Sequence, residues 1–308
     1  MEILSFPLTR ASGTLSITAD TREDTVYIEG EGVTCRQALV LIGLGIGIWA
    51  LIAIPGEIKE AESTHVIELS NAFMDLKLSA DKMRVNDLSG ARFSMLMPGS
   101  SGMSGTTIEF EETGGKLSIV GTEGIPPKTW SVERLSARVG GTRGTTVIGY
   151  EGGGVFRSDN GHGVWLTPGL LEVYPDTTET NATVRVDMVI VNLSGAAMAS
   201  SNLAAPVDFQ YVERTDDFTW SKATNNTLEI SFTGGSKEQR DLWYALFRES
   251  ALRYDEKPDS QKIEVKASNN NGEYATLTIN VKTGGDEWVK VYVREATYDV
   301  SLMKRYES

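Results

Sequence analysis

The 308-residue chain has a single cysteine, Cys35, and only two histidines, His65 and His162. One cysteine cannot form an intramolecular disulfide, so the stability of the fold does not depend on an oxidising compartment. Two histidines far apart in the sequence do not supply the closely spaced ligands of a zinc site. We therefore expect no metal and no cofactor.

Basic residues are also scarce, because 29 lysines and arginines face 42 aspartates and glutamates, which gives a formal net charge of −13. Binding to a nucleic-acid backbone needs clustered cations, so we expect no nucleic-acid partner. The first ten residues, MEILSFPLTR, have neither the basic region nor the short apolar run of a secretory signal. We expect a protein that acts in the cytoplasm or leaves the cell by lysis.

Catalytic motifs are missing as well. The chain has no G-x-S-x-G elbow and no Walker or Rossmann loop. His162 lies in SDNGHGVW, where the neighbouring Asp, Asn and Gly are typical of a turn rather than of a catalytic or ligand site. The acidic residues Glu109, Glu111 and Glu112, close to Gly114, fit a solvated hairpin better than a glycosidase pair. We expect no enzymatic activity.

What the sequence does have is a long apolar run, Ala38 to Ile54, without a charged or polar side chain. As a strand, it would place large side chains on one face and glycines on the other. As a helix, it would be about 26 Å long, slightly shorter than a bilayer core, with Gly43 and Gly47 at the close-approach spacing of packed helices. A core element, a subunit interface and a membrane contact all remain open.

Burial of this run would stabilise an assembly by on the order of 10 kcal/mol before ordering costs, so we expect a homo-oligomer. The expected assembly interface consists of Leu41, Ile42, Gly43, Leu44, Gly45, Ile46, Gly47, Ile48 and Trp49.

The rest of the chain predicts a mostly β fold, a multi-domain antiparallel β-sandwich of immunoglobulin-like architecture. Apolar and polar residues alternate over 184–190 and 275–281, as in half-buried antiparallel strands. Further hairpins are expected around residues 20–24, 80–81 and 114–115. One amphipathic helix is expected over 237–254, because Ser236 and Gln239 form a capping box ahead of an apolar stripe.

Breaks rich in small residues divide the chain into three expected domains. These are residues 1–98 with the assembly segment 38–54, a glycine-rich β domain over 99–205, and an immunoglobulin-like domain over 206–308.

Residues 262–285, KIEVKASNNNGEYATLTINVKTGG, place Ser268, Asn269, Asn270, Asn271 and Gly272 at a turn before a Thr-rich strand. This segment resembles the closing hairpin of BACON domains, immunoglobulin-like modules abundant in Bacteroidetes proteins and in the crAss-like phages that infect them. The resemblance implies a virion or surface protein, with a glycan-facing module as one option, and it implies no catalysis.

Our leading hypothesis is a non-enzymatic phage virion structural protein, located in the virion as a fibre, spike, collar or capsid-decoration element. Its partners would be copies of itself and other virion proteins. One alternative is a carbohydrate-binding module, with Trp165, Tyr150 and His162 as glycan contacts if their rings are exposed. The other is a membrane-associated β protein anchored by residues 38–54.

Overall fold

The computed structural model describes residues 8–10, 13–20, 25–29, 35–99, 105–121, 127–141, 144–176, 183–195, 198–200, 204–214, 218–223, 227–255, 263–281 and 288–302. Over residues 35–59 the description covers the backbone alone. The chain divides into two compact units, Met1–Glu60 and Ala61–Ser308.

The first unit contains a small antiparallel sheet in the order β1-β2-β3, formed by Leu8–Arg10, Gly13–Asp20 and Thr25–Glu29. The β2–β3 hairpin confirms the prediction around residues 20–24. Helix α1 then begins at Cys35 and ends at Val85. Residues 38–54 are therefore helical, which decides between the two conformations that the sequence left open.

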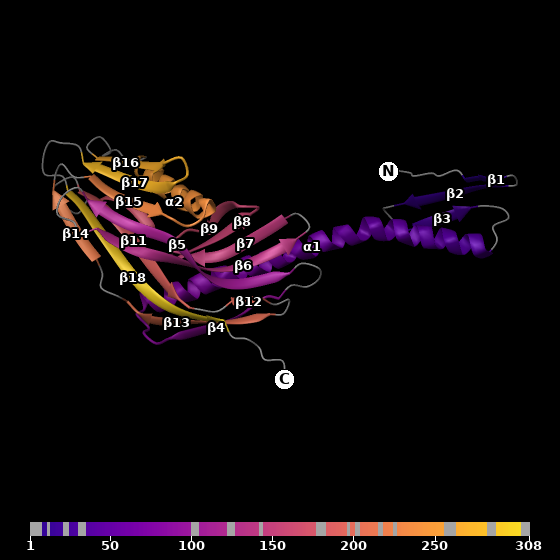
Figure 1. The fold of residues 1–308 in the computed structure, drawn as a ribbon, viewed down its shortest axis with the longest axis horizontal. Helices are drawn as coiled ribbons and strands as arrows, with labels where there is room; N and C mark the ends of the chain where they lie inside the picture. Colours follow the sequence, from indigo (N-terminus) through magenta and orange to yellow (C-terminus); the bar gives the residue numbers. More distant parts are fainter. Residues whose placement is uncertain are drawn as a thin grey trace. The chain divides into compact units, whose positions relative to one another are not determined.

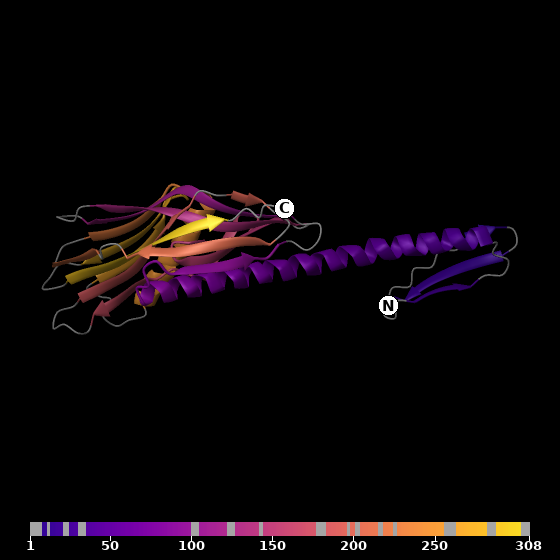
Figure 2. The ribbon, with the colours of Figure 1, turned by 90° about the horizontal axis from the view of Figure 1, so that it is seen from below.

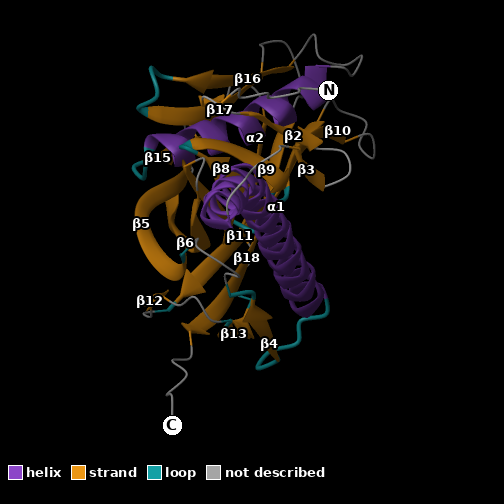
Figure 3. Ribbon diagram, turned by 90° about the vertical axis from the view of Figure 1, so that its right-hand side faces the viewer, coloured by secondary structure: helices purple, strands orange, loops and turns teal. Residues whose placement is uncertain are grey.

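The second unit is built from two sheets, and Figure 3 shows strands making up most of it. The first sheet has the order β10-β11-β18-β13-β4, with β14 also paired to β18. We call it the β18 sheet. Its strands are β4 (Arg92–Met97), β10 (Leu171–Asp176), β11 (Thr183–Ser194), β13 (Ala205–Glu213), β14 (Phe218–Ala223) and β18 (Trp288–Leu302).

The second sheet, which we call the β5 sheet, has the order β16-β17-β15-β5-β6-β7-β8-β9, with β12 also paired to β5. Its strands are β5 (Thr106–Gly121), β6 (Lys128–Gly141), β7 (Gly144–Glu151), β8 (Gly154–Asp159), β9 (His162–Thr167), β12 (Met198–Ser200), β15 (Thr227–Thr233), β16 (Ile263–Asn269) and β17 (Tyr274–Val281). Both sheets are curled, and the mostly β, sandwich-type fold expected from the sequence is confirmed.

Among the described strands, one pairing departs from the expected antiparallel arrangement. Strands β11 and β18 run parallel, in register from Thr183 opposite Trp288 to Ser194 opposite Asp299. A parallel pair needs a crossover connection, and the chain from β12 to β17 supplies it. The strands over 184–190 and 275–281 themselves lie where alternation predicted them.

The C-terminal half of α1 is a core element of the second unit, and Figure 2 shows it beside the strands. One ridge of the helix is buried, and its members recur at spacings of three and four residues. The ridge consists of Val66, Leu69, Phe73, Leu76, Ala80 and Met83. It packs against both sheets in a cluster that includes Leu135, Tyr150, Phe209 and Tyr298.

The hairpin predicted around residues 80–81 is therefore wrong. Leu76 and Leu78 alternate with polar residues and would share one face of a strand, but the helix places them on different sides. Leu76 is fully buried, whereas Leu78 is 69% exposed.

The hairpin predicted around Gly114 and Gly115 is also wrong, because β5 runs through both residues and pairs with β6 on either side. Gly114 has a φ of 69°, which produces a register shift in the ladder instead of a chain reversal. Gly115 has no room for a side chain, since a Cβ there would lie 2.7 Å from the Phe232 ring.

Helix α2, Lys237–Asp255, confirms the helix predicted over 237–254. Its capping box is present, because Gln239 N donates to Ser236 Oγ and Ser236 N donates to Gln239 Oε1. The helix lies beside β15, β16 and β17 (Figure 1) and buries Trp243 and Phe247 in the core. The β16–β17 hairpin follows it, with the left-handed residues Asn271 and Gly272 at the expected turn.

Strands on both sides of residues 98 and 205 contribute to the same two sheets. The three-domain boundaries stay a prediction. No helix within the described residues is long and apolar enough to cross a membrane.

Candidate functional site

The expected assembly interface, Leu41–Trp49, lies within α1. The backbone of this segment is helical, and its side chains lie outside the described residues. On a helix, Gly43 and Gly47 are one turn apart and therefore share a face.

Two of the three glycan candidates belong to the core. Tyr150 is fully buried between α1 and the β18 sheet, so its ring offers no face to a sugar. Trp165 is half-buried, its Nε1 donates to the carbonyl oxygen of Leu242 at 2.7 Å, and its ring packs edge-on against Trp243. Both rings therefore contribute to packing in the core of the second unit.

His162, the third candidate, is exposed at the start of β9. It follows a two-residue turn in which Asn160 and Gly161 have φ values of 52° and 83°. Both central residues of a type I′ hairpin turn have positive φ, which explains why Asn and Gly stand here. The local sequence is thus accounted for by the turn.

His65 is buried on α1, with its Nε2 atom 2.8 Å from Thr106 Oγ1. Burial lowers the pKa of His65, and the nearby charge of Glu68 opposes that change. Within the described residues, no group of three or more His, Cys, Asp or Glu side chains could hold a metal ion.

The acidic residues singled out on β5 form a pair. Burial, a hydrogen bond to Glu109 and the charge of Glu109 raise the pKa of Glu111 to about 7, while Arg134 and Arg138 act in the opposite direction. Arg138 Nη2 lies 3.4 Å from Glu109 Oε1 and 3.9 Å from Glu111 Oε1. These carboxylates are therefore not the fully solvated acids that the sequence predicted.

The sequence did not indicate a fully buried carboxylate, Glu151, at the end of β7. Its Oε2 accepts from Arg134 Nε at 2.7 Å and from Gln239 Nε2 at 2.9 Å, and its Oε1 accepts from Trp243 Nε1 at 2.9 Å. The Arg134 guanidinium also lies 4.1 Å from the centre of the Phe156 ring. These partners of Glu151 lie on β6 and on α2, so this group joins α2 to the β5 sheet.

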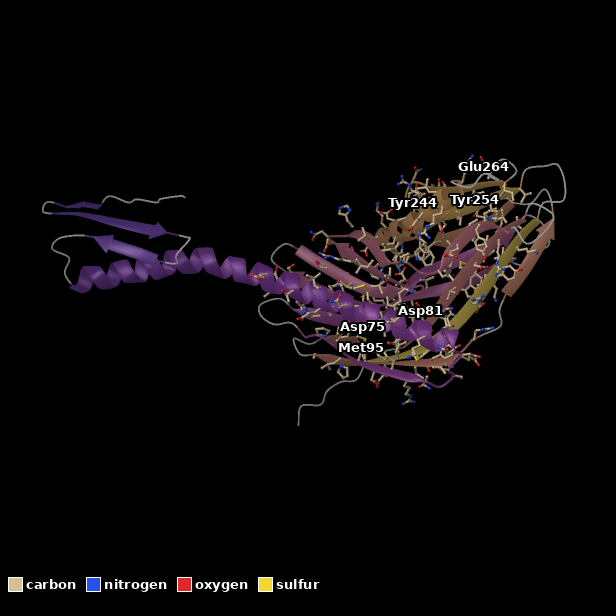
Figure 4. All side chains as sticks on the ribbon, turned by 180° about the vertical axis from the view of Figure 1, so that it is seen from behind. Asp75, Asp81, Met95, Tyr244, Tyr254 and Glu264 are labelled. Carbon is tan, nitrogen blue, oxygen red and sulfur yellow. The ribbon has the colours of Figure 1, made fainter. Side chains whose placement is uncertain are left out.

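A pocket of about 260 Å³ opens where the two helices and the two sheets meet. Lys77, Asp81 and Arg84 from the last turns of α1 line it, and Asp81 is labelled in Figure 4. Helix α2 contributes Leu246, Glu249, Ser250 and Arg253. The remaining lining comes from Gly153, Pro168, Gly169, Leu170, Leu171, Glu172 and Val189.

Glycines shape the wall of this pocket. The β7–β8 turn has φ values of 54° at Gly152 and 81° at Gly153. It packs backbone to backbone against the loop before β10, where a Cβ at Gly169 would lie 2.4 Å from the Gly152 oxygen. The triple glycine of residues 152–154 thus allows two turns to meet without side chains between them.

No family model, no curated protein and no solved structure matches this chain.

Proposed function

We propose that this protein is a non-enzymatic structural protein that assembles as a homo-oligomer through residues 38–54 of α1. The observation that supports this proposal is that α1 is one continuous helix from Cys35 to Val85. A run without polar side chains lies on the same helix as a ridge that is fixed in the core of the second unit. A helix that is apolar on every side needs a covering surface, and a second copy supplies one.

The glycines on this segment specify how copies would pack. Gly43 and Gly47 are four residues apart on one face, so two helix backbones can approach closely there. Gly45 lies about 200° around the helix from Gly43 and would face away from that contact.

The test is the mass of the full chain in detergent-free solution, measured by light scattering after size-exclusion chromatography. We expect a defined oligomer whose association weakens at least about ten-fold in the double variant Gly43→Leu, Gly47→Leu, because the added side chains separate the backbones. Gly45→Leu is the matched control and should keep the oligomer. A monomeric full chain, or an oligomer that tolerates the double variant, would refute the proposal.

Flotation with phosphatidylcholine vesicles tests the alternative that residues 38–54 insert into a lipid bilayer. A monomeric chain that floats with the vesicles would show that this segment inserts into a bilayer and does not form a subunit interface. A chain that stays in the aqueous fraction as an oligomer supports the proposal.

In its finer form, the proposal places the oligomer in a phage virion as a fibre, spike, collar or capsid-decoration element, in contact with other virion proteins. The β16–β17 hairpin, which lies within the segment that resembles BACON domains, and the β-rich body support this form. Genes for portal, capsid or tail proteins on either side of its gene would agree with it, and a neighbourhood of metabolic genes would contradict it.

A further inference from the structure

The pocket between α1 and α2 has a chemistry that the assembly proposal does not use. Its lining carries three cations, Lys77, Arg84 and Arg253, and three carboxylates, Asp81, Glu172 and Glu249. The formal charges cancel, so the pocket as a whole favours neither a simple anion nor a simple cation.

The cations keep unused donors. Within the described residues, Lys77 and Arg84 both pair with Asp81, at 2.6 and 3.1 Å, and Arg253 pairs with Glu249 at 2.5 Å. A lysine ammonium has three donors and a guanidinium has five. This corner of the pocket can therefore accept a carboxylate.

Strand β10 supplies a negatively charged group that can accept a cation. Glu172 is exposed at the pocket, and the described residues form no ion pair with it. Its carboxylate is free to accept an ammonium group. The pocket thus offers both partners that a zwitterion needs, on different elements of the fold.

Most of the remaining side chains in the lining are aliphatic, and Ser250 adds one hydroxyl. Pro168, Leu170, Leu171, Val189 and Leu246 supply apolar surface, and none of the described residues that line the pocket is aromatic. Sugar sites commonly stack the ring on an aromatic face, so this lining suits a branched aliphatic group better than a sugar. A volume of about 260 Å³ suits a small molecule.

We infer that this pocket binds a zwitterionic aliphatic amino acid. Its carboxylate lies against Arg84 and Arg253, its ammonium lies against Glu172, and its side chain packs on Leu246 and Val189. The inference is independent of what covers residues 38–54, because the lining residues all belong to the second unit.

Titration of the full chain tests the inference, with L-leucine as the probe and saturation-transfer NMR as the readout. Two analogues are the matched ligands: isocaproate lacks the ammonium, and isoamylamine lacks the carboxylate. We expect saturable leucine binding, with each analogue at least about ten-fold weaker, because each loses one charge-assisted contact. Absence of saturable leucine binding, or equal binding of either analogue, would overturn the inference.

Two exposed positions supply variants that keep the fold, which thermal unfolding checks. Glu172→Gln and Arg253→Gln should each weaken leucine binding about ten-fold. Arg157→Gln is the control, since Arg157 pairs with Asp159 on β8 and does not line the pocket. Leucine binding that is unchanged in both pocket variants would place the ligand elsewhere and overturn the assignment.

Discussion

A single residue, Glu151, connects α2 to the β5 sheet through its hydrogen bonds. A fully buried carboxylate is costly unless several donors satisfy it, and here three side chains do so. One of them, Gln239, also caps α2, so its oxygen and its nitrogen serve different elements. The start of the helix and its attachment to the sheet thus depend on the same side chain.

Glu111 is the residue at which pH should act on stability. Its pKa in the folded chain is raised from 4.5 to about 7, first of all by burial. Between these two values the folded state holds a proton that the unfolded state releases. The contribution of Glu111 to the free energy of unfolding should therefore decrease as pH rises through this range, and the loss of this contribution should be complete above about pH 7.

The variant Glu111→Gln should remove this dependence, because the amide is neutral at every pH. We expect it to match the parent chain at about pH 4 and to exceed its stability by about 1–2 kcal/mol at about pH 8. This is less than the full change in pKa implies, because the Glu111 side chain is 34% exposed and solvent screens it.

Urea unfolding at several pH values measures this effect. Glu273→Gln, in the exposed β16–β17 turn, is the control for losing one carboxylate. A stability difference between the parent chain and Glu111→Gln that stays constant between about pH 4 and pH 8 would contradict the raised pKa of Glu111, because the contributions of all other groups cancel in this difference.

At the scale of elements, α1 combines two parts with different surroundings. Its C-terminal half has one buried ridge, whereas residues 38–54 are apolar on all sides. Pro55 lies between these parts, where it removes one helical hydrogen bond and disturbs the preceding turn. The boundary between the two compact units follows shortly afterwards, at Glu60.

Substitutions on the two sides of α1 should differ sharply in their effect on stability. Phe73 is fully buried, so Phe73→Ala should cost about 3–5 kcal/mol of unfolding free energy. Leu78→Ala removes a side chain that is 69% exposed and should stay within about 0.5 kcal/mol. Urea denaturation followed by circular dichroism measures both. Similar costs for the two variants would mean that the ridge is not the packed face.

Sequence reasoning found the elements whose signals are local. The capping box of Ser236 and Gln239 located α2, and strict alternation located the strands over 184–190 and 275–281. It missed the C-terminal half of α1 because Leu76 and Leu78 also fit the two-residue period of a strand. Only the packing against the sheets distinguishes a helix from a strand here. Gly114 was misread because a left-handed glycine serves a bulge as well as a turn.

The candidate sites were harder to foresee because their partners are distant in the chain. Glu151 bonds to Gln239, 88 positions away, and the pocket draws on both helices, two strands and two connecting turns. The spacing of residues in a single sequence does not predict contacts between side chains that are so far apart in the chain. The apolar run is the exception, since its composition alone demands a covering surface.

At the scale of the whole molecule, the division at Glu60 separates the proposed assembly segment from a body that has its own core. A chain of residues 61–308 keeps the complete ridge from Val66 to Met83, and with it the packing of α1 against both sheets. A chain of residues 87–308 loses that ridge and exposes the cluster around Tyr150 and Phe209.

The two truncated chains should therefore behave differently. We expect residues 61–308 to fold, with near-ultraviolet circular dichroism like that of the full chain, and to be monomeric in light scattering, because residues 38–54 are gone. Residues 87–308 should aggregate or remain unfolded, because burial of the ridge contributes on the order of 10 kcal/mol before ordering costs. An oligomer formed by residues 61–308 with the subunit number of the full chain would show that copies contact each other through the second unit, and it would rule out residues 38–54 as the assembly segment.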